Sequence, residues 1–193
     1  METLQQMQVG TRLCAPVEGQ CIDITEVDDP VFNTKILGDG IAICPETNLI
    51  KAPCDGVISN VYRSKNAFVI TANDGTEILV HAGINTINDH GKGFRVFVKI
   101  NQEVCQGSPV MEFNTASMND SYDMTVMMLV SNEQNCALDK CSTAQRVSCQ
   151  DEVMSVKQNR SAEEQNGQGS TISELHPDRT IYLWHELCQN YMN

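Results

Sequence analysis

His81 is the residue of this sequence best placed to do chemistry, because it ends an apolar run and small residues follow it at once. The run is Glu77-Ile78-Leu79-Val80-His81, and Ala82 and Gly83 come next. A neutral imidazole nitrogen is nucleophilic near pH 7. At a strand end opened by glycine, such a ring can meet another protein. His81 is therefore a candidate nucleophile, and a histidine of the core is the alternative.

The strand that carries His81 is predicted to pair with the strand that begins at Asn66. Alternation puts His81 on one face with Glu77 and Leu79, which indicates a position outside the deep core. A two-residue loop would put Asn66 directly opposite His81. A three-residue loop ending in a glycine bulge at Gly75 would shift the register by one and send Asn66 to the other face. The sequence leaves both registers open.

Residues 11–114 are typical of an all-β domain. Short alternating or β-branched runs are separated by Gly, Pro and Asp-Gly pairs at intervals of about ten residues. This pattern predicts an all-β sandwich or barrel. Ala15-Pro16-Val17-Glu18-Gly19 is echoed by Ala52-Pro53-Cys54-Asp55-Gly56, and each copy leads into a β-rich run. The echo indicates a duplicated motif of two similar hairpin units packed face to face.

The chain is predicted to have one domain with a leader and a tail. Residues 1–10 form the leader, residues 11–158 the β-sandwich domain, and residues 159–193 a linker and tail with a possible short helix. Within the domain, 126–130 and 153–156 are expected to be strands, 93–100 a further strand, and 115–125 a loop.

Composition and charge exclude several classes of function. The net charge is −12 over 193 residues, which argues against nucleic acid and anionic membrane as partners. The sequence has neither a long apolar run nor a signal peptide, so a cytoplasmic location is expected. The nine cysteines contain no C-x2-C pair. They predict neither a disulfide framework nor a metal site, and no cofactor is expected.

Several separated segments, in order, resemble the glucose-type enzyme IIA domain of the bacterial phosphoenolpyruvate-dependent sugar phosphotransferase system. The matching segments are Ala15-Pro16 with Gly19, Asp29-Pro30-Val31-Phe32, Leu37 to Ile43, Ala52-Pro53 with Asp55-Gly56, Gly75 to Thr86, and Gly91 to Phe94. The resemblance implies an antiparallel β-sandwich with a barrel-like core. It also implies that His81 accepts a phosphoryl group from the phosphocarrier HPr and passes it to a cysteine of an enzyme IIB domain for sugar uptake. The membrane would be reached only through the permease partner.

The resemblance also assigns residues around His81, with one departure. Where the family usually has a second histidine, this chain has Asn66, and Ser64 replaces the usual threonine nearby. An amide donates hydrogen bonds but carries no positive charge. The loss of a charge-assisted bond is expected to slow transfer by roughly ten- to a hundredfold and to remove a metal site shared by two histidines. The Gly83 carbonyl is expected to hold the other ring nitrogen of His81.

The remaining assignments concern partner docking. Val31 and Phe32 are predicted to form an exposed apolar rim around the nucleophile. The full docking set is Asp29, Val31, Phe32, Leu79 and Asn85, with Asn85 standing where an aspartate is common. Two functions stay open: a phosphocarrier enzyme, or a non-catalytic or transfer-impaired regulatory binding protein that uses the same fold and docking face. A peptidase on a related fold is less favoured, because further ligand-spaced histidines and aspartates are missing.

Overall fold

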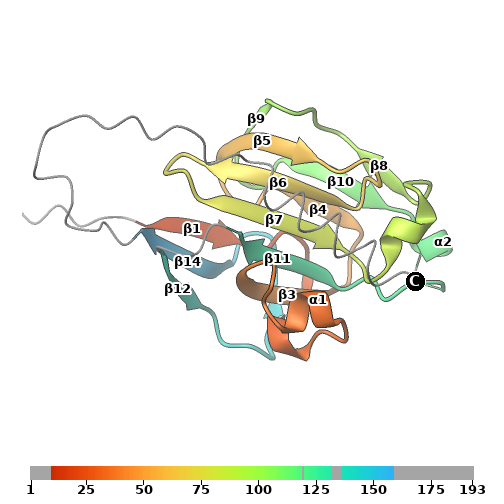
Figure 1. Cartoon of the computed structure of the whole chain (residues 1–193), viewed down its shortest axis with the longest axis horizontal. Coiled ribbons are helices and arrows are strands. Elements are labelled where there is room, and N and C mark those ends of the chain that lie inside the picture. Colours follow the sequence, from red (N-terminus) through yellow and green to blue (C-terminus); the bar gives the residue numbers. More distant parts are fainter. Residues whose placement is uncertain (1–9, 119, 132–135, 159–193) are drawn as a thin grey trace, which may run out of the picture. The chain divides into compact units, whose positions relative to one another are not determined.

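The fold is built from antiparallel sheets, as the sequence predicts (Figure 1). The structure is a computed structural model that describes residues 10–118, 120–131 and 136–158. One sheet has eight strands in the order β13-β2-β3-β11-β7-β6-β5-β9, and two smaller sheets have the orders β4-β10-β8 and β1-β14-β12. The large sheet is open, with β13 and β9 at its edges, so the expected barrel-like core is not a closed barrel in the described part of the chain.

The secondary structure of the described residues consists of short strands and a few single helical turns. The strands are β1 (Thr11–Cys14), β2 (Gly19–Asp23), β3 (Asp39–Pro45), β4 (Leu49–Lys51), β5 (Gly56–Val61), β6 (Ala67–Ala72), β7 (Glu77–Ala82), β8 (Phe94–Val96), β9 (Glu103–Val104), β10 (Pro109–Phe113), β11 (Val126–Val130), β12 (Cys136–Lys140), β13 (Arg146–Val147) and β14 (Glu152–Gln158). The helical turns are η1 (Ile24–Glu26), α1 (Pro30–Asn33), η2 (Thr86–Asp89) and α2 (Thr115–Met118).

Most of the expected strands are present, and two expectations are wrong in detail. The strand predicted at 126–130 is β11, and the one predicted at 153–156 lies within β14. The strand predicted at 93–100 stops after β8 at Val96, and the loop predicted at 115–125 begins with the α2 turn. The predicted leader, apart from Gly10, and the predicted tail lie outside the described residues.

The duplicated motif is visible in the backbone hydrogen bonds. The Cys14 N–H donates to the Pro53 carbonyl (2.8 Å), and the Lys51 N–H donates to the Pro16 carbonyl (2.8 Å), so the two Ala-Pro corners hold each other reciprocally. The hairpins that follow them, β2–β3 and β5–β6, lie on opposite sides of β11 and β7 within the large sheet. The two echoed segments therefore lead into hairpins of the same sheet, whereas the echo predicted two units packed face to face.

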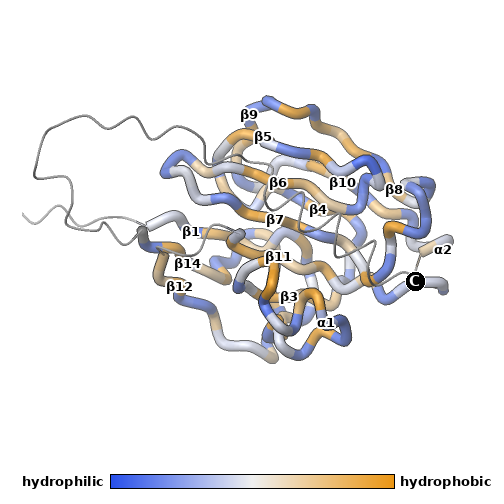
Figure 2. Tube along the Cα trace, viewed as in Figure 1, coloured by the Kyte–Doolittle hydropathy of each residue, from blue (hydrophilic) through white to orange (hydrophobic). Residues whose placement is uncertain are grey.

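Both faces of the central strands are buried. On β7, Ile78, Val80 and Ala82 belong to the main apolar core of the sandwich. Leu79 and His81 point to the other face, where the η1–α1 segment supplies Ile24 and Phe32, and these four residues are at most 2% exposed. Figure 2 shows the matching hydropathy, with apolar residues along β7, β11 and β3 and hydrophilic residues at the turns. A helical segment thus covers the sheet face on which His81 lies.

Candidate functional site

His81 lies near the end of the central strand β7, between the two strands that pair with it. Its partners across the ladders are Ala67 on β6 and Met127 on β11. The imidazole is only 2% exposed. The ring of Phe32, carried by α1, covers it with 5.2 Å between ring centroids. The expectation that His81 stands outside the deep core is therefore wrong, because α1 covers the face that strand alternation assigned to it.

The β6–β7 hairpin has the three-residue loop, with Gly75 at φ +88°. Ala67, and not Asn66, is therefore directly opposite His81. The predicted consequence, that Asn66 would point to the other face, is wrong. Asn66 lies in the β5–β6 turn, one residue before β6 begins, where strand alternation does not apply. Its side chain reaches His81 from that turn.

The Asn66 amide connects three other side chains. Asn66 Nδ2 lies 3.0 Å from His81 Nε2 and donates to Thr86 Oγ1 at 3.0 Å, while Ser64 Oγ donates to Asn66 Oδ1 at 2.5 Å. The Thr86 hydroxyl in turn donates to the Ala82 carbonyl at 2.7 Å. Because its proton is committed there, Thr86 Oγ1 must accept from Asn66, which fixes the amide orientation.

This orientation determines the protonation state of His81. An amide nitrogen only donates, so His81 Nε2 accepts the bond from Asn66 and carries a lone pair instead of a proton. Burial lowers the pKa of His81 to about 3, and a hydrogen bond with the Gly83 backbone opposes part of this shift. At neutral pH the ring is therefore uncharged, with its proton on Nδ1.

Gly83 shapes the turn that follows His81. Its φ is +78°, and a Cβ there would lie 2.4 Å from Thr86 Cγ2 and 3.0 Å from the Asp123 carbonyl oxygen. The glycine lets Thr86 fold back to the end of β7, where its hydroxyl also lies 3.3 Å from the Gly83 carbonyl. Thr86 was not among the predicted site residues. Its position five residues after the histidine, in the same motif, was the only sequence signal for it.

The predicted docking residues have different environments. Phe32 and Leu79 are each 2% exposed, so the expected exposed rim is wrong for Phe32. Val31 is half-buried, and Asp29 caps α1 by accepting from the Val31 N–H at 2.8 Å. Asn85 is exposed with φ +57°, a left-handed conformation that asparagine tolerates better than most residues. Among the five, Phe32 is the residue whose ring packs against the imidazole of His81.

Within residues 10–118, 120–131 and 136–158, no group of three or more His, Cys, Asp or Glu side chains is placed to hold a metal ion. Within the same ranges, no helix has the length and apolar character needed to cross a membrane.

The fold and the site define a class of protein: an antiparallel β-sandwich that holds a neutral histidine on a central strand, next to a polar cluster. Residues 11–136 match the family described as phosphoenolpyruvate-dependent sugar phosphotransferase system, EIIA 1, and the chain belongs to this family. The family resemblance found in the sequence is thereby confirmed.

Known relatives agree with this assignment. Two proteins of Staphylococcus carnosus (strain TM300) match over 121 residues: a PTS system glucose-specific EIICBA component at 40% identity and a glucoside-specific EIICBA component at 36%. Each match covers 63% of this chain but only 18% of the relative. The solved structure of glucose permease IIA from Mycoplasma capricolum superposes with a TM-score of 0.68 and 29% identity, covering 81% of this chain and 99% of that one.

Proposed function

We propose that this chain is a phosphocarrier that accepts a phosphoryl group from HPr on His81 and passes it to an enzyme IIB cysteine of a sugar permease. The observation that carries the proposal is the 3.0 Å contact of Asn66 Nδ2 with His81 Nε2, within the cluster that Asn66 forms with Ser64 and Thr86. This contact leaves a lone pair on Nε2 of a neutral imidazole. Contact with the membrane would come only through the permease, and residues 11–158 would be the acting domain.

In the proposed transfer, a P–N bond forms at His81 Nε2 as the bond from phosphorus to its donor breaks. The Asn66 amide releases Nε2 and donates to a phosphoryl oxygen instead, and the proton on Nδ1 stays in place near the Gly83 backbone. Asn66 stands for the second histidine of the family. Because it brings no positive charge, transfer is expected to be roughly ten- to a hundredfold slower.

A second function, a regulatory protein that transfers its phosphoryl group poorly or acts by binding alone, is favoured by the uncharged Asn66 amide and by the burial of His81, which slows loading and discharge alike. The imidazole is covered by Phe32 and its nucleophilic nitrogen already accepts a bond from Asn66. Phosphoryl transfer therefore requires α1 to move away and Asn66 to change partner. In both functions, the docking face consists of the α1 side of the sheet, with Asp29, Val31 and Asn85 at its accessible edge.

The first experiment tests loading. The chain is incubated with phosphoenolpyruvate, enzyme I and HPr, and acid-labile phosphate is measured by mass spectrometry. We expect one phosphoryl group that His81→Ala abolishes. The exposed His90 is the matched control, and His90→Ala should load like the unmodified chain. Absence of labile phosphate on the unmodified chain would eliminate the phosphocarrier function and leave only a regulator that acts by binding.

The second experiment distinguishes the two functions. The loaded chain is mixed with an enzyme IIB domain, and the rate of phosphate loss is compared with that of the loaded Asn66→His variant. A carrier discharges at a useful rate in both forms, whereas a regulator discharges only after the substitution. If Asn66→His gives no gain in either case, the assignment of Asn66 as the replacement for the second histidine is wrong.

A further inference from the structure

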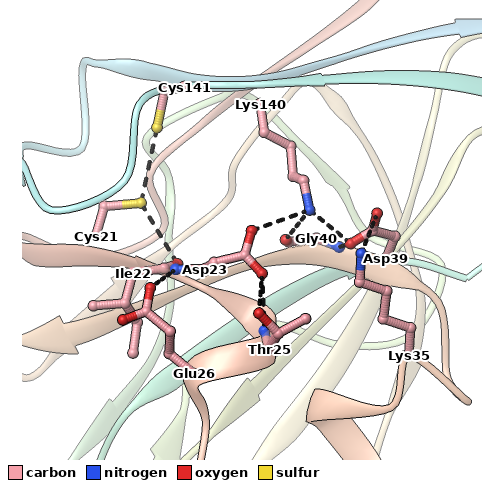
Figure 3. A network of polar contacts seen from close by, with 10 residues as sticks. All are labelled: Cys21, Ile22, Asp23, Thr25, Glu26, Lys35, Asp39, Gly40, Lys140 and Cys141. Carbon is pink, nitrogen blue, oxygen red and sulfur yellow. Dashed lines mark hydrogen bonds and ion pairs between the residues drawn. The ribbon is translucent and has the colours of Figure 1, made fainter.

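Two cysteines that play no part in the phosphoryl site lie against each other. Cys21 Sγ on β2 and Cys141 Sγ, directly after β12, are 3.8 Å apart (Figure 3). Cys21 is fully buried and Cys141 is half-buried, and both are free thiols. The two side chains point toward each other from different sheets, since β2 belongs to the eight-stranded sheet and β12 to the β1-β14-β12 sheet.

Backbone hydrogen bonds hold both cysteines in this position. The Cys21 N–H donates to the Gln145 carbonyl at 2.8 Å, and the Cys21 carbonyl accepts from the Ala144 N–H at 2.8 Å. The Cys141 N–H donates to the Val153 carbonyl on β14, also at 2.8 Å. The short segment from Cys141 to Gln145 is thus tied to the neighbouring strands at both ends, so the approach of the two sulfurs is set by the main chain.

An ionic network next to the two cysteines also holds the end of β12 in place, through its last residue, Lys140. Lys140 Nζ lies 2.7 Å from Asp39 Oδ1 and 3.5 Å from Asp23 Oδ2, and it donates to the Gly40 carbonyl at 3.1 Å (Figure 3). Asp23 follows Cys21 by two residues, and Lys140 directly precedes Cys141. The same two strands are therefore joined by a charged contact and by a thiol–thiol contact side by side.

We propose that Cys21 and Cys141 form a reversible disulfide that joins β2 to the end of β12. A disulfide bond is about 2.05 Å long, so the sulfurs need to move less than about 2 Å toward each other. The proposal goes beyond the phosphocarrier function and does not depend on it. It gives this chain a redox-modification site in the sandwich itself, apart from His81.

The oxidant is a low-molecular-weight disulfide such as oxidised glutathione. The Cys141 thiolate attacks one sulfur of the oxidant, forming a mixed disulfide and releasing the first glutathione thiolate. Cys21 then loses its proton and attacks the Cys141 sulfur, and the second glutathione leaves as a thiolate. The two protons lost by the cysteines end on the two glutathione thiols, so the protein pair is oxidised by two electrons and the oxidant is reduced by two.

The environments of the two thiols indicate which of them reacts first with the oxidant. Burial, and next the neighbouring Cys141, raises the pKa of the Cys21 thiol to about 12, so Cys21 is a poor first nucleophile. Cys141 is the more accessible of the two. Cys141 therefore reacts first with the oxidant, and Cys21 closes the bond only after the mixed disulfide has formed beside it.

Peptide mapping tests the cross-link directly. The full chain is treated with oxidised glutathione, its remaining thiols are alkylated, and it is digested with trypsin without reduction. Cleavage after Arg12, Lys35, Lys140 and Arg146 should release residues 13–35 linked to residues 141–146, two hydrogens lighter than the separate peptides. Dithiothreitol should separate them. Only alkylated peptides, or Cys141 carrying glutathione without a cross-link, would overturn the proposal.

Variants distinguish this pair from other cysteines. Peptide 13–35 also contains Cys14, so the cross-link must persist in Cys14→Ser. Peptide 141–146 contains only Cys141, so the partner is identified by Cys21→Ala, in which the cross-link must disappear. A linked peptide that persists in Cys21→Ala, or that vanishes in Cys14→Ser, assigns the bond to Cys14 and rejects the pair.

Thermal unfolding supplies a second readout. A cross-link that spans this long stretch of chain should raise the Tm of the oxidised protein by on the order of 10 °C. Cys44→Ser, on the adjacent strand β3 but exposed, is the matched control and should keep the rise. The rise should be lost in Cys141→Ser and reversed by dithiothreitol. An unchanged Tm after oxidation would contradict the stabilising cross-link.

Discussion

Asn66 Nδ2 lies 3.0 Å from His81 Nε2, and this contact sets the chemical state of the candidate nucleophile. The amide has its oxygen turned to Ser64 and its nitrogen turned to both His81 and Thr86, so it acts on the imidazole as a donor. A donor at Nε2 leaves the lone pair on that nitrogen and the proton on Nδ1. The same contact that keeps the lone pair on Nε2 also occupies that lone pair with a hydrogen bond.

Replacing the donor with an acceptor should reverse the state of the ring. In Asn66→Asp, a carboxylate faces Nε2 and favours a proton there, so the pKa of His81 should rise from about 3 toward its ordinary value of 6.5. Nitrogen NMR shifts of the imidazole report this directly. We expect Nδ1–H in the unmodified chain and Nε2–H or imidazolium in the variant.

The matched control for this substitution is Asn88→Asp, which adds the same charge at an exposed position. It should leave the tautomer of His81 unchanged. If Asn66→Asp also leaves Nδ1 protonated and Nε2 bare at pH 6, the deduced orientation of the Asn66 amide is wrong.

The depressed pKa of His81 predicts a loss of stability in acid. The folded chain keeps the ring neutral down to about pH 3, whereas the unfolded chain takes up the proton below about pH 6.5. Unfolding therefore binds a proton in this window, and the free energy of unfolding decreases as the pH falls through it. The slope due to this group approaches about 1.4 kcal/mol per pH unit.

Urea unfolding between pH 6.5 and 4.5 measures this slope against a variant. His81→Gln has no titrating ring, so its stability should decrease less steeply by about that amount. The carboxyl groups titrate in both proteins, so their contribution to the pH dependence of stability cancels in the comparison. His90→Gln should retain the full slope, because His90 is exposed. Parallel pH profiles for His81→Gln and the unmodified chain would contradict a buried neutral imidazole.

The Phe32 ring controls access to His81. Phe32→Ala removes the ring that lies 5.2 Å from the imidazole centroid and should cost about 3–5 kcal/mol of stability. Carbethoxylation of His81 by diethyl pyrocarbonate, followed by mass spectrometry, should become faster by on the order of tenfold, since the reagent no longer waits for α1 to open.

Loss of stability alone could also expose His81, so the control is an equally buried phenylalanine elsewhere. Phe113 is 2% exposed in the main core, and Phe113→Ala should destabilise the fold to a similar extent. Its His81 should nevertheless react slowly under conditions where both variants stay folded. Equal reaction rates in the two variants would show that Phe32 is ordinary core.

The sequence predicts the strands of this fold and the face of β7 on which His81 lies better than it predicts their surroundings. The period-two pattern of β7 correctly separates Ile78 and Val80 from Leu79 and His81, because alternation is a local property of the strand. Whether the second face meets solvent is not local. It depends on α1, which is far from β7 in the sequence and places Phe32 on the imidazole.

The direction of the Asn66 side chain is a second feature that strand alternation does not predict. Both registers considered from the sequence treat Asn66 as a strand residue, and in either case its direction would follow from the register. In the structure Asn66 belongs to the β5–β6 turn, next to Lys65 at φ +57°, so its direction is set by that turn. Turn geometry of this kind depends on left-handed residues that the sequence marks only weakly.

Gly75 and Gly83 have similar backbone angles but different surroundings. Comparing them distinguishes the cost of a strained backbone from the cost of steric overlap with neighbouring atoms. Gly83 and Gly75 have φ values of +78° and +88°, but a Cβ on Gly75 meets nothing within 4 Å, whereas one on Gly83 would lie 2.4 Å from Thr86 Cγ2. Gly75→Ala should therefore cost about 1 kcal/mol, from conformation alone. Gly83→Ala should cost about 2–4 kcal/mol, because overlap adds to that strain.

The pair can be tested further by removing the atom that the new methyl group would strike. Thr86→Ser keeps the hydroxyl that binds Asn66 and Ala82 but lacks Cγ2, so the double variant Gly83→Ala/Thr86→Ser should regain part of the lost stability. Urea unfolding of the four proteins gives the coupling energy between the two positions. We expect a coupling of about 1 kcal/mol or more in favour of the double variant, since the substitutions act on one contact. Simple additivity would mean that the 3.0 Å approaches to the Asp123 carbonyl and Met124 Sδ, and not Thr86, limit position 83.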